Sequence, residues 1–267
     1  MPEPILDVEP ILEVAGLRKR FGGLAVTDDV SFAVAPGGIH AIIGPNGAGK
    51  TTLIHQLSGS LRPDAGRIRF AGRDVTSLPP QRRARLGLAR SFQITSVIPG
   101  FPVLENVALA VQGRSGGSFR FFRAAAGEAR LNAVALAALD QVGLAGRAAA
   151  LAGALSHGEK RQLELAMALA MQPKLLLLDE PLAGAGPEET TRLVALLSAL
   201  KRHHTILLVE HDMQAVFALA DRISVLVYGR IIATDAPDAI RADAAVRAAY
   251  LGEDAPEGEW PEGEWGA

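Results

Sequence analysis

The chain contains no cysteine, which excludes disulfide bonds, thiolate metal sites and catalysis by a thiol. It also has no stretch that approaches the roughly 20 consecutive apolar residues of a membrane-spanning helix. The most apolar candidate, LELAMALAMQPKLLLLD, is interrupted by Gln172, Pro173 and Lys174. We therefore expect a protein that does not itself cross a membrane.

The N-terminal segment, MPEPILDVEP, has neither the basic region nor the apolar region of a secretory signal peptide. Together with the lack of cysteine, this favours a cytoplasmic location. The formal net charge is only −2, so the chain has no overall attraction to nucleic acid, and we expect no nucleic-acid partner. The 267 residues, 49% of them apolar, are ample for a hydrophobic core.

Charge is nevertheless distributed unevenly along the chain. Residues 252–267 contain six acidic residues and no basic one, and the unit PEGEW occurs there twice. Because Pro, Gly and Glu dominate this segment, we expect it to be an acidic, disordered tail. Eight arginines are scattered through strand and turn patterns, which favours a solvated basic face: Arg62, Arg67, Arg69, Arg73, Arg82, Arg83, Arg85 and Arg90.

Short apolar runs bounded by charge or glycine recur at 40–44, 174–180, 205–211 and 222–229. Continuous apolarity of this length is typical of strands buried on both faces of a parallel sheet. Helical patterns such as 187–203 lie between these runs. The alternation predicts an α/β fold.

The middle of the chain has a different composition. From about 103 to 172 it is rich in Ala and Leu, and the segments LNAVALAALDQVGL and LELAMALAM favour helices. We interpret 94–171 as a helical insert, which divides the α/β core into 11–93 and 172–251.

The stretch GPNGAGKTT follows an apolar run and precedes a helical one, and it matches the pattern G-x-x-x-x-G-K-[ST] in full. Glycines let backbone N–H groups converge on phosphate oxygens, and the helix N-terminus adds partial positive charge. The lysine is expected to reach the β- and γ-phosphates of ATP, and Thr51 to place its hydroxyl on Mg²⁺. The nucleotide-binding residues expected from this loop are Gly44, Asn46, Gly47, Gly49, Lys50, Thr51 and Thr52.

The stretch LLLLDE ends a predicted buried strand with two carboxylates. Ligands collect at the carboxyl ends of such strands. Alone, these could be two solvated acids, but phosphoryl transfer beside a P-loop needs a metal holder and a group that orients water. We therefore predict that Asp179 holds Mg²⁺ and that Glu180 points at the attacking water.

Taken alone, LSHGEKRQLELA indicates a well-capped helix, because Ser156 and Glu159 form the common capping box. In combination, the P-loop, this stretch and the LLLLDEP that follows resemble the ATP-binding-cassette (ABC) ATPase family, whose signature is LSGGQ. The resemblance spans roughly 11–251. It implies a P-loop NTPase (RecA-like) core of the α/β class, with an antiparallel β edge and an inserted helical subdomain.

In this family two cassettes pair head to tail and bury two ATP molecules between them. The resemblance thus implies that Ser156 and Gly158 contact the ATP of a partner, either a second ABC ATPase subunit or another copy of this chain. The chain departs from the signature at His157 and Glu159, where the family usually has Gly and Gln. His157 is expected to face away from the phosphate.

Further positions match the family one at a time. Gln93, in RSFQIT, resembles the Q-loop glutamine that joins the metal site to the helical domain. His211, in LLVEHD, resembles the switch histidine at the γ-phosphate, so the resemblance gives catalytic roles to Glu180, His211 and Gln93. Phe21, in KRFGG, resembles the aromatic residue that stacks on adenine, although a core Phe remains an alternative. The implied metal-site residues are Thr51, Gln93 and Asp179.

Several segments, including LRKRFGGLAVTDDVSF, FPVLENV and AAYLGE, resemble the ATPase subunits of branched-chain amino-acid importers. Such a subunit works with two membrane permeases and, indirectly, an external substrate-binding protein, at the inner face of the cell membrane. Related cassettes serve urea, short amides or lipopolysaccharide export, so several cargoes remain open.

Two other classes of protein remain as alternatives. Soluble ABC ATPases that act on DNA or ribosomes usually carry two cassettes or long coiled-coil insertions, whereas this chain has one P-loop and no heptad run. A P-loop kinase for a small molecule would leave LSHGE and His211 unexplained.

Overall fold

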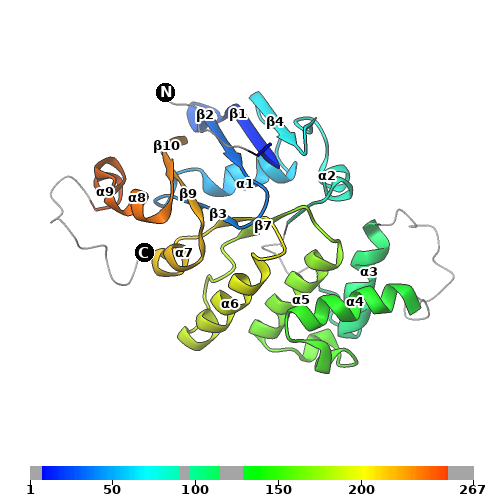
Figure 1. The fold of residues 1–267 in the computed structure, drawn as a ribbon. Coiled ribbons are helices and arrows are strands. Elements are labelled where there is room, and N and C mark those ends of the chain that lie inside the picture. The colour runs from blue at the N-terminus through cyan, green and yellow to red at the C-terminus, as the bar shows by residue number, and fades with distance from the viewer. Residues whose placement is uncertain (1–7, 91–96, 115–128, 252–267) are drawn as a thin grey trace.

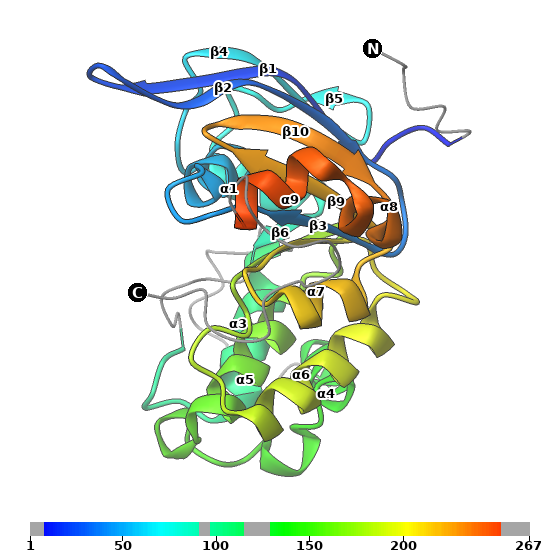
Figure 2. The same cartoon turned by 90° about the vertical axis from the view of Figure 1, so that its left-hand side faces the viewer.

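The computed structural model describes residues 8–90, 97–114 and 129–251. The molecule has an antiparallel sheet at one end, a largely parallel sheet in the middle and a group of helices at the other end (Figure 2). The predicted α/β class is therefore confirmed. Of the helices in the described ranges, none is both long and apolar enough to cross a membrane.

The central sheet contains the buried apolar runs. Its strands run in the order β10-β9-β3-β8-β7-β6, and β10 alone is antiparallel to its neighbour. Every residue of β3, β7 and β8 is buried, which explains their continuous rather than alternating apolarity. The strands are β3 (Ile39–Ile43), β6 (Leu88–Arg90), β7 (Leu175–Asp179), β8 (Ile206–Val209), β9 (Arg222–Val227) and β10 (Arg230–Asp235).

The antiparallel sheet lies beside the central sheet, and its strands run in the order β2-β1-β4-β5. Its strands are β1 (Leu12–Phe21), β2 (Leu24–Val34), β4 (Ala65–Phe70) and β5 (Arg73–Asp74). Leu12, Val14 and Leu17 on β1 are buried, while the end of the β1–β2 hairpin is exposed. This sheet matches the antiparallel edge that the family resemblance implies.

Helices cover both faces of the central sheet. α3, α4 and α5 pack on one another away from the antiparallel sheet (Figure 1). The helices are α1 (Lys50–Ser58), α2 (Pro80–Leu86), α3 (Val103–Arg114), α4 (Ala129–Gln141), α5 (His157–Ala170), α6 (Pro187–Leu200), α7 (Met213–Leu219), α8 (Pro237–Ala242) and α9 (Ala244–Leu251).

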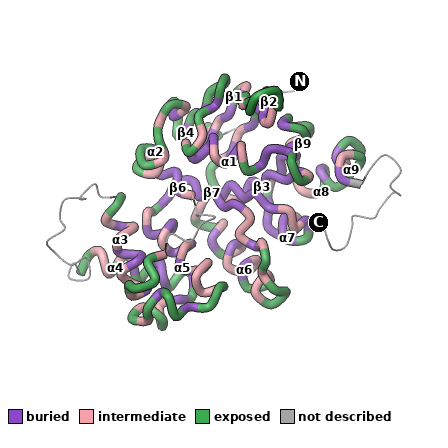
Figure 3. The backbone as a smooth tube through the Cα atoms, turned by 180° about the vertical axis from the view of Figure 1, so that it is seen from behind, coloured by how far each residue is buried: buried purple, intermediate pink, exposed green. Residues whose placement is uncertain are grey.

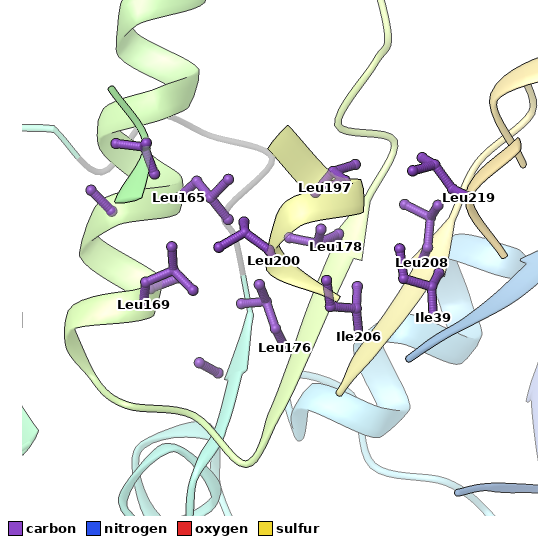
Figure 4. Close-up of a cluster of buried hydrophobic side chains, with 14 of the residues drawn as sticks. Ile39, Leu165, Leu169, Leu176, Leu178, Leu197, Leu200, Ile206, Leu208 and Leu219 are labelled. Atoms are coloured by element: carbon purple, nitrogen blue, oxygen red, sulfur yellow. The ribbon is translucent and has the colours of Figure 1, made fainter. Parts of the chain in front are cut away.

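Two hydrophobic cores lie on opposite faces of the central sheet, because successive side chains of a strand point to opposite sides. Leu175 and Leu177 of β7 join the core that contains α1 and the antiparallel sheet. Leu176 and Leu178 join the core that contains α5 and α6, where leucines of both helices meet the strand (Figure 4). In Figure 3 the backbone of β3 and β7 is coloured as buried, because these strands lie between the two cores. Because the sheet is packed on both faces, the loops at the carboxyl ends of its strands are anchored to a rigid element.

The predicted basic face is wrong at two of its eight arginines. Arg83 is 1% exposed and donates hydrogen bonds to the carbonyl oxygens of Gln56 and Leu57 at the C-terminal end of α1. Carbonyls at a helix end lack intrahelical partners and attract a cation, so this arginine caps the helix from inside. Burial lowers the pKa of Arg83 to about 10. Arg90, the second exception, belongs to the candidate site, and the other six are exposed.

His40, a buried residue of β3, should make stability depend on pH. Its Nε2 lies 2.8 Å from the hydroxyl of Ser224, and burial lowers its pKa from 6.5 to about 4. Unfolded chains take up this proton near pH 6.5 but the folded chain does so only near pH 4, so the free energy of unfolding falls as pH falls through that window. We expect a loss of about 2 kcal/mol between pH 7 and pH 5 from this group.

The measurement is urea unfolding of the parent and of His40→Asn at pH 7 and pH 5. Burial raises the pKa of Glu164 to about 7, so that carboxyl contributes with the opposite sign in both proteins. The difference between parent and variant removes the contribution of Glu164 and isolates that of His40. An equal pH dependence in the two proteins would contradict the assignment.

Candidate nucleotide-binding and hydrolysis site

The glycine-rich loop 44–49 joins β3 to α1 at the carboxyl edge of the parallel strands (Figure 1). A Cβ at Gly44 would collide with the carbonyl oxygen of Leu226, and one at Gly49 with that of Val26. Gly49 also has a φ of 103°, which favours glycine, and it caps the N-terminus of α1. Only glycine therefore allows this close backbone packing, which holds the start of α1 in place.

Lys50, the first residue of α1, lies back over the glycine-rich loop. Its Nζ donates hydrogen bonds to the carbonyl oxygens of Gly44 at 2.5 Å and Pro45 at 3.1 Å. Burial lowers the pKa of Lys50, and the carboxylates of Glu180 and Asp179 oppose that shift. Phosphate oxygens can take the place of these carbonyl oxygens as hydrogen-bond acceptors. The ammonium group is therefore positioned to bind an anion at the loop.

Asp179 and Glu180 follow one another at the end of β7 but differ in environment. The Asp179 side chain is 2% exposed, whereas Glu180 is partly exposed. Glu180 has a φ of 47°, and its backbone N–H donates to the Val209 carbonyl at 2.8 Å. A positive φ on a residue other than glycine costs about 1–3 kcal/mol and is frequent at functional sites. Both residues line a cavity of about 180 Å³ beside α5 and α6.

Arg90 is a residue of this site that the sequence analysis misplaced on the solvated face. It ends β6, next to β7, and its Nη2 lies 2.9 Å from Oδ2 of Asp179. Their side chains are only 12% and 2% exposed. A buried carboxylate requires such a partner, which explains why this arginine turns inward. The signal in the sequence was an arginine that ends a short apolar strand, LAR.

Glu210 is a second residue that the sequence analysis missed. It follows β8, has 0% exposure, and accepts a hydrogen bond from the backbone N–H of Leu182 at 2.8 Å. Its Oε2 accepts another from the backbone N–H of His211 and lies 3.4 Å from Nδ1 of the same histidine. Burial raises the pKa of Glu210. The signal was available, because ILLVE ends an apolar run with a carboxylate as LLLLDE does.

The start of α5 has the capping box that the sequence predicts. Ser156 Oγ accepts the backbone N–H of Glu159 at 3.3 Å, and the Glu159 carboxylate accepts the backbone N–H of Ser156 at 2.8 Å. Gly158 lies against Glu189 of α6, and Arg161 donates to the Ala183 carbonyl. Ser156 and His157 are exposed, so the N-terminus of α5 faces solvent.

Phe21 lies at the end of β1 and is 52% exposed. The alternative of a core phenylalanine is therefore wrong, and part of the ring is accessible from solvent. The Nζ of Lys19 lies 5.7 Å from the ring centroid. Gln93 and the tail 252–267 lie outside the described residues.

The sheet brings most of the predicted residues together. β3, β8 and β7 are neighbours and parallel, so the glycine-rich loop, the Glu210–His211 segment and the Asp179–Glu180 pair end at one edge. At this edge the carboxylates of Glu180, Asp179 and Glu210 favour the charged form of Lys50 and oppose the lowering of its pKa by burial. The N-terminus of α5 instead contacts α6, Ala183 and Arg147, the last through an ion pair with Glu159.

The residues at this edge fit a nucleotide-bound Mg²⁺. In the described part of the chain, no group of three or more His, Asp or Glu side chains could hold a metal by itself. Mg²⁺ usually takes one or two carboxylates together with substrate phosphates. Thr51 is exposed in the first turn of α1, and Asp179 is the last residue of β7, at the same edge of the sheet.

Solved structures place this arrangement in a class. A crystal structure of the ADP conformation of MJ1267, an ATP-binding cassette of an ABC transporter, matches with a TM-score of 0.81 and 30% identity, covering 92% of this chain and 100% of that one. A nucleotide-free cassette from an ABC transporter matches with a TM-score of 0.80, 30% identity and the same coverage. The fold is that of a P-loop ABC ATPase, with its helical subdomain inserted.

Sequence comparisons identify the family. The ABC transporter model matches residues 27–183, and the model "Branched-chain amino acid ATP-binding cassette transporter" matches 230–256. The transport ATP-binding protein LivG of Escherichia coli K12 is 40% identical, covering 92% of this chain and 99% of LivG. BraF of Pseudomonas aeruginosa is 39% identical, over 91% of this chain and 98% of BraF. The chain belongs to the ATP-binding-cassette family of transporter ATPases.

Proposed function

We propose that this chain is the ATP-hydrolysing subunit of an importer for branched-chain amino acids and that its ATP-driven dimerisation powers uptake through two partner permeases. An external substrate-binding protein would deliver the cargo, and the chain would lie at the inner face of the cell membrane. The names of the relatives LivG and BraF support this cargo over urea, short amides or lipopolysaccharide. The observation that supports the catalytic part is that the glycine-rich loop, with Lys50 bonded to its carbonyls, and the Asp179–Glu180 pair lie at the same edge of the parallel sheet.

Each residue at the sheet edge has a task in the proposed reaction. The loop residues Gly44, Asn46, Gly47 and Gly49, with Lys50 and the hydroxyls of Thr51 and Thr52, bind the phosphates, and Phe21 stacks on adenine. Thr51, Gln93 and Asp179 would hold Mg²⁺, which would neutralise charge on the phosphates. Glu180 orients the attacking water and accepts its proton, and His211 contacts the γ-phosphate.

The exposed N-terminus of α5 is assigned to the ATP of a partner cassette. Ser156 and Gly158 lie at a helix N-terminus, which attracts phosphate through its free N–H groups and dipole. Solvent exposure of Ser156 leaves it accessible to a second cassette, either another copy or a different ATPase subunit. We assign 94–171 to the helical subdomain that carries this helix and 11–93 with 172–251 to the core. The packing of α3, α4 and α5 on one another supports that division.

An exposed apolar cluster on the helical part is the surface assigned to the permeases. Ile98, Phe101 and Leu151 are 41%, 40% and 54% exposed. The backbone joins them, because the Phe101 N–H donates to the Ile98 carbonyl, the Ala152 N–H donates to the Phe101 carbonyl, and Leu151 bridges Pro102. Adjacent exposed apolar side chains are typical of protein interaction sites.

Phe101→Asp should weaken assembly with the permeases. A charge in the centre of an apolar contact must be desolvated, so we expect recovery of permease with the tagged ATPase to fall at least about tenfold. Leu136→Asp is the matched control, since Leu136 is equally exposed, at 41%, but belongs to α4. Equal recovery for both variants and the parent would remove this surface assignment.

Vesicle transport tests the proposed cargo. The chain is co-expressed with its candidate permeases and binding protein, and vesicles are prepared so that their lumen corresponds to the cytoplasm. Uptake of labelled leucine is then measured with ATP in the lumen. We expect ATP-dependent leucine uptake that unlabelled valine and isoleucine compete for and urea does not. Competition by urea or short amides alone would assign the chain to the related cassettes, and hydrolysis that no permease alters would favour a soluble ABC ATPase.

A further inference from the structure

Glu210 joins two loops that flank the proposed catalytic centre. One carboxylate oxygen, Oε1, accepts the backbone N–H of Leu182, two residues beyond Glu180. The other, Oε2, accepts the backbone N–H groups of His211 at 2.8 Å and Asp212 at 3.4 Å. With 0% exposure, this side chain is held entirely by the protein.

Burying a carboxylate to join two loops has a high cost in free energy. Its desolvation costs several kcal/mol unless hydrogen bonds and a countercharge offset it. A carboxylate suits this place because both of its oxygens accept, whereas an amide has one acceptor oxygen and could not accept from both loops. The Nδ1 of His211 lies 3.4 Å from Oε2, so the same carboxylate also has the imidazole ring as a neighbour.

Glu210 has little influence on Lys50 of the P-loop. Of the three carboxylates that oppose the effect of burial on the pKa of Lys50, its effect is the smallest, after Glu180 and Asp179. The His211 side chain is 40% exposed, and Nδ1 is the ring nitrogen that lies next to buried Glu210. The two ring nitrogens differ in role, and the partner of one determines what the other presents.

We propose that Glu210 is a positioning residue for hydrolysis: it holds the His211 ring through Nδ1, so that Nε2 faces the γ-phosphate, and keeps the loop after Glu180 in register with it. The proposal rests on the proposed function, in which His211 contacts that phosphate. Glu210 itself touches neither the nucleotide nor the reacting water. Its removal should therefore change the rate of hydrolysis and not the affinity for ATP.

Glu210→Gln keeps the size of the side chain, removes its charge and leaves only one of its two acceptor oxygens. We expect kcat to fall about 10–100-fold, by analogy with the loss of a residue that orients a metal-binding histidine. The dissociation constant of ATP, measured with a fluorescent analogue, should stay within about threefold of the parent. Asp221→Asn is the matched control: Asp221 accepts the Ile39 N–H at 2.8 Å and pairs with Lys201 at the opposite end of β3. Its kcat should match the parent.

A spectroscopic measurement on the parent protein makes the test independent of how well the variant folds. With ¹⁵N-labelled histidine and His211→Asn for assignment, the ring of His211 should show a protonated Nδ1. In Glu210→Gln that signal should shift toward the average of an unconstrained imidazole. A parent ring with the proton on Nε2 alone would overturn the proposal.

The kinetic outcomes are equally decisive. A folded Glu210→Gln with kcat within twofold of the parent, or an equal loss in Asp221→Asn, would overturn the positioning role. Loss of ATP binding in Glu210→Gln would do so too, because it would make the residue a structural support of the P-loop. Retention of ATP binding by Lys50→Ala would instead contradict the proposed function. The measurement of the His211 ring does not depend on ATP binding, so it would still test the contact between Glu210 and His211.

Discussion

Lys50→Ala should lose most of its affinity for ATP and all measurable turnover. The Lys50 ammonium is buried among the loop carbonyls and within reach of three carboxylates, so a phosphate would meet it in a largely dehydrated place. Removing one member of a buried charge pair costs about 2–5 kcal/mol, which corresponds to a roughly 30- to 4000-fold loss of affinity. Equilibrium binding of a fluorescent ATP analogue gives this number directly.

Lys201→Ala is the control for the loss of a lysine. Lys201 pairs with Asp221 and donates to the Leu219 carbonyl at the far edge of the sheet, so its removal should leave ATP affinity unchanged. Circular dichroism on both variants checks that the fold persists. ATP binding by Lys50→Ala at the affinity of the parent would show that the glycine-rich loop is not a nucleotide site in this chain.

The fold could be predicted where burial is simple. β3, β7 and β8 are buried on both faces, so each appears in the sequence as an unbroken apolar run, and their parallel order follows from the helices between them. The antiparallel sheet came only from the family resemblance. Its strand β4 reads AGRIRF, in which charge alternates with two buried residues, and that pattern alone does not fix its partners.

The site could be predicted where a motif fixes the backbone. At Gly44 and Gly49 a Cβ would collide with a backbone carbonyl oxygen, so the position requires glycine and the requirement is visible in the sequence. Arg90 and Glu210 were missed because a charged residue in a sequence is ordinarily a solvated one. Their burial depends on partners far along the chain, Asp179 for the first and Leu182 for the second, which only the folded sheet brings close.

Glu180→Gln should separate binding of ATP from its hydrolysis. The amide preserves the size of the side chain and its place beside Asp179, but it cannot accept a proton from water. General-base catalysis contributes about 10²–10⁴-fold, so turnover should fall by that factor. Affinity for ATP should hold, because Lys50 and the glycine-rich loop are unchanged. Glu188→Gln is the matched control, since the Glu188 side chain is 92% exposed at the start of α6.

The same variant tests the pairing of two cassettes. If hydrolysis reopens the pair, a chain that binds ATP but does not hydrolyse it should accumulate as a dimer. Sedimentation of Glu180→Gln with ATP should then show an ATP-dependent dimer, alone or with its partner ATPase, that persists after Mg²⁺ is added, whereas the dimer of the parent should dissociate as Mg²⁺ permits hydrolysis. Turnover within twofold of the parent would remove Glu180 from its role. Slow turnover without a dimer, even with the partner present, would mean that Ser156 and Gly158 do not complete the opposite site.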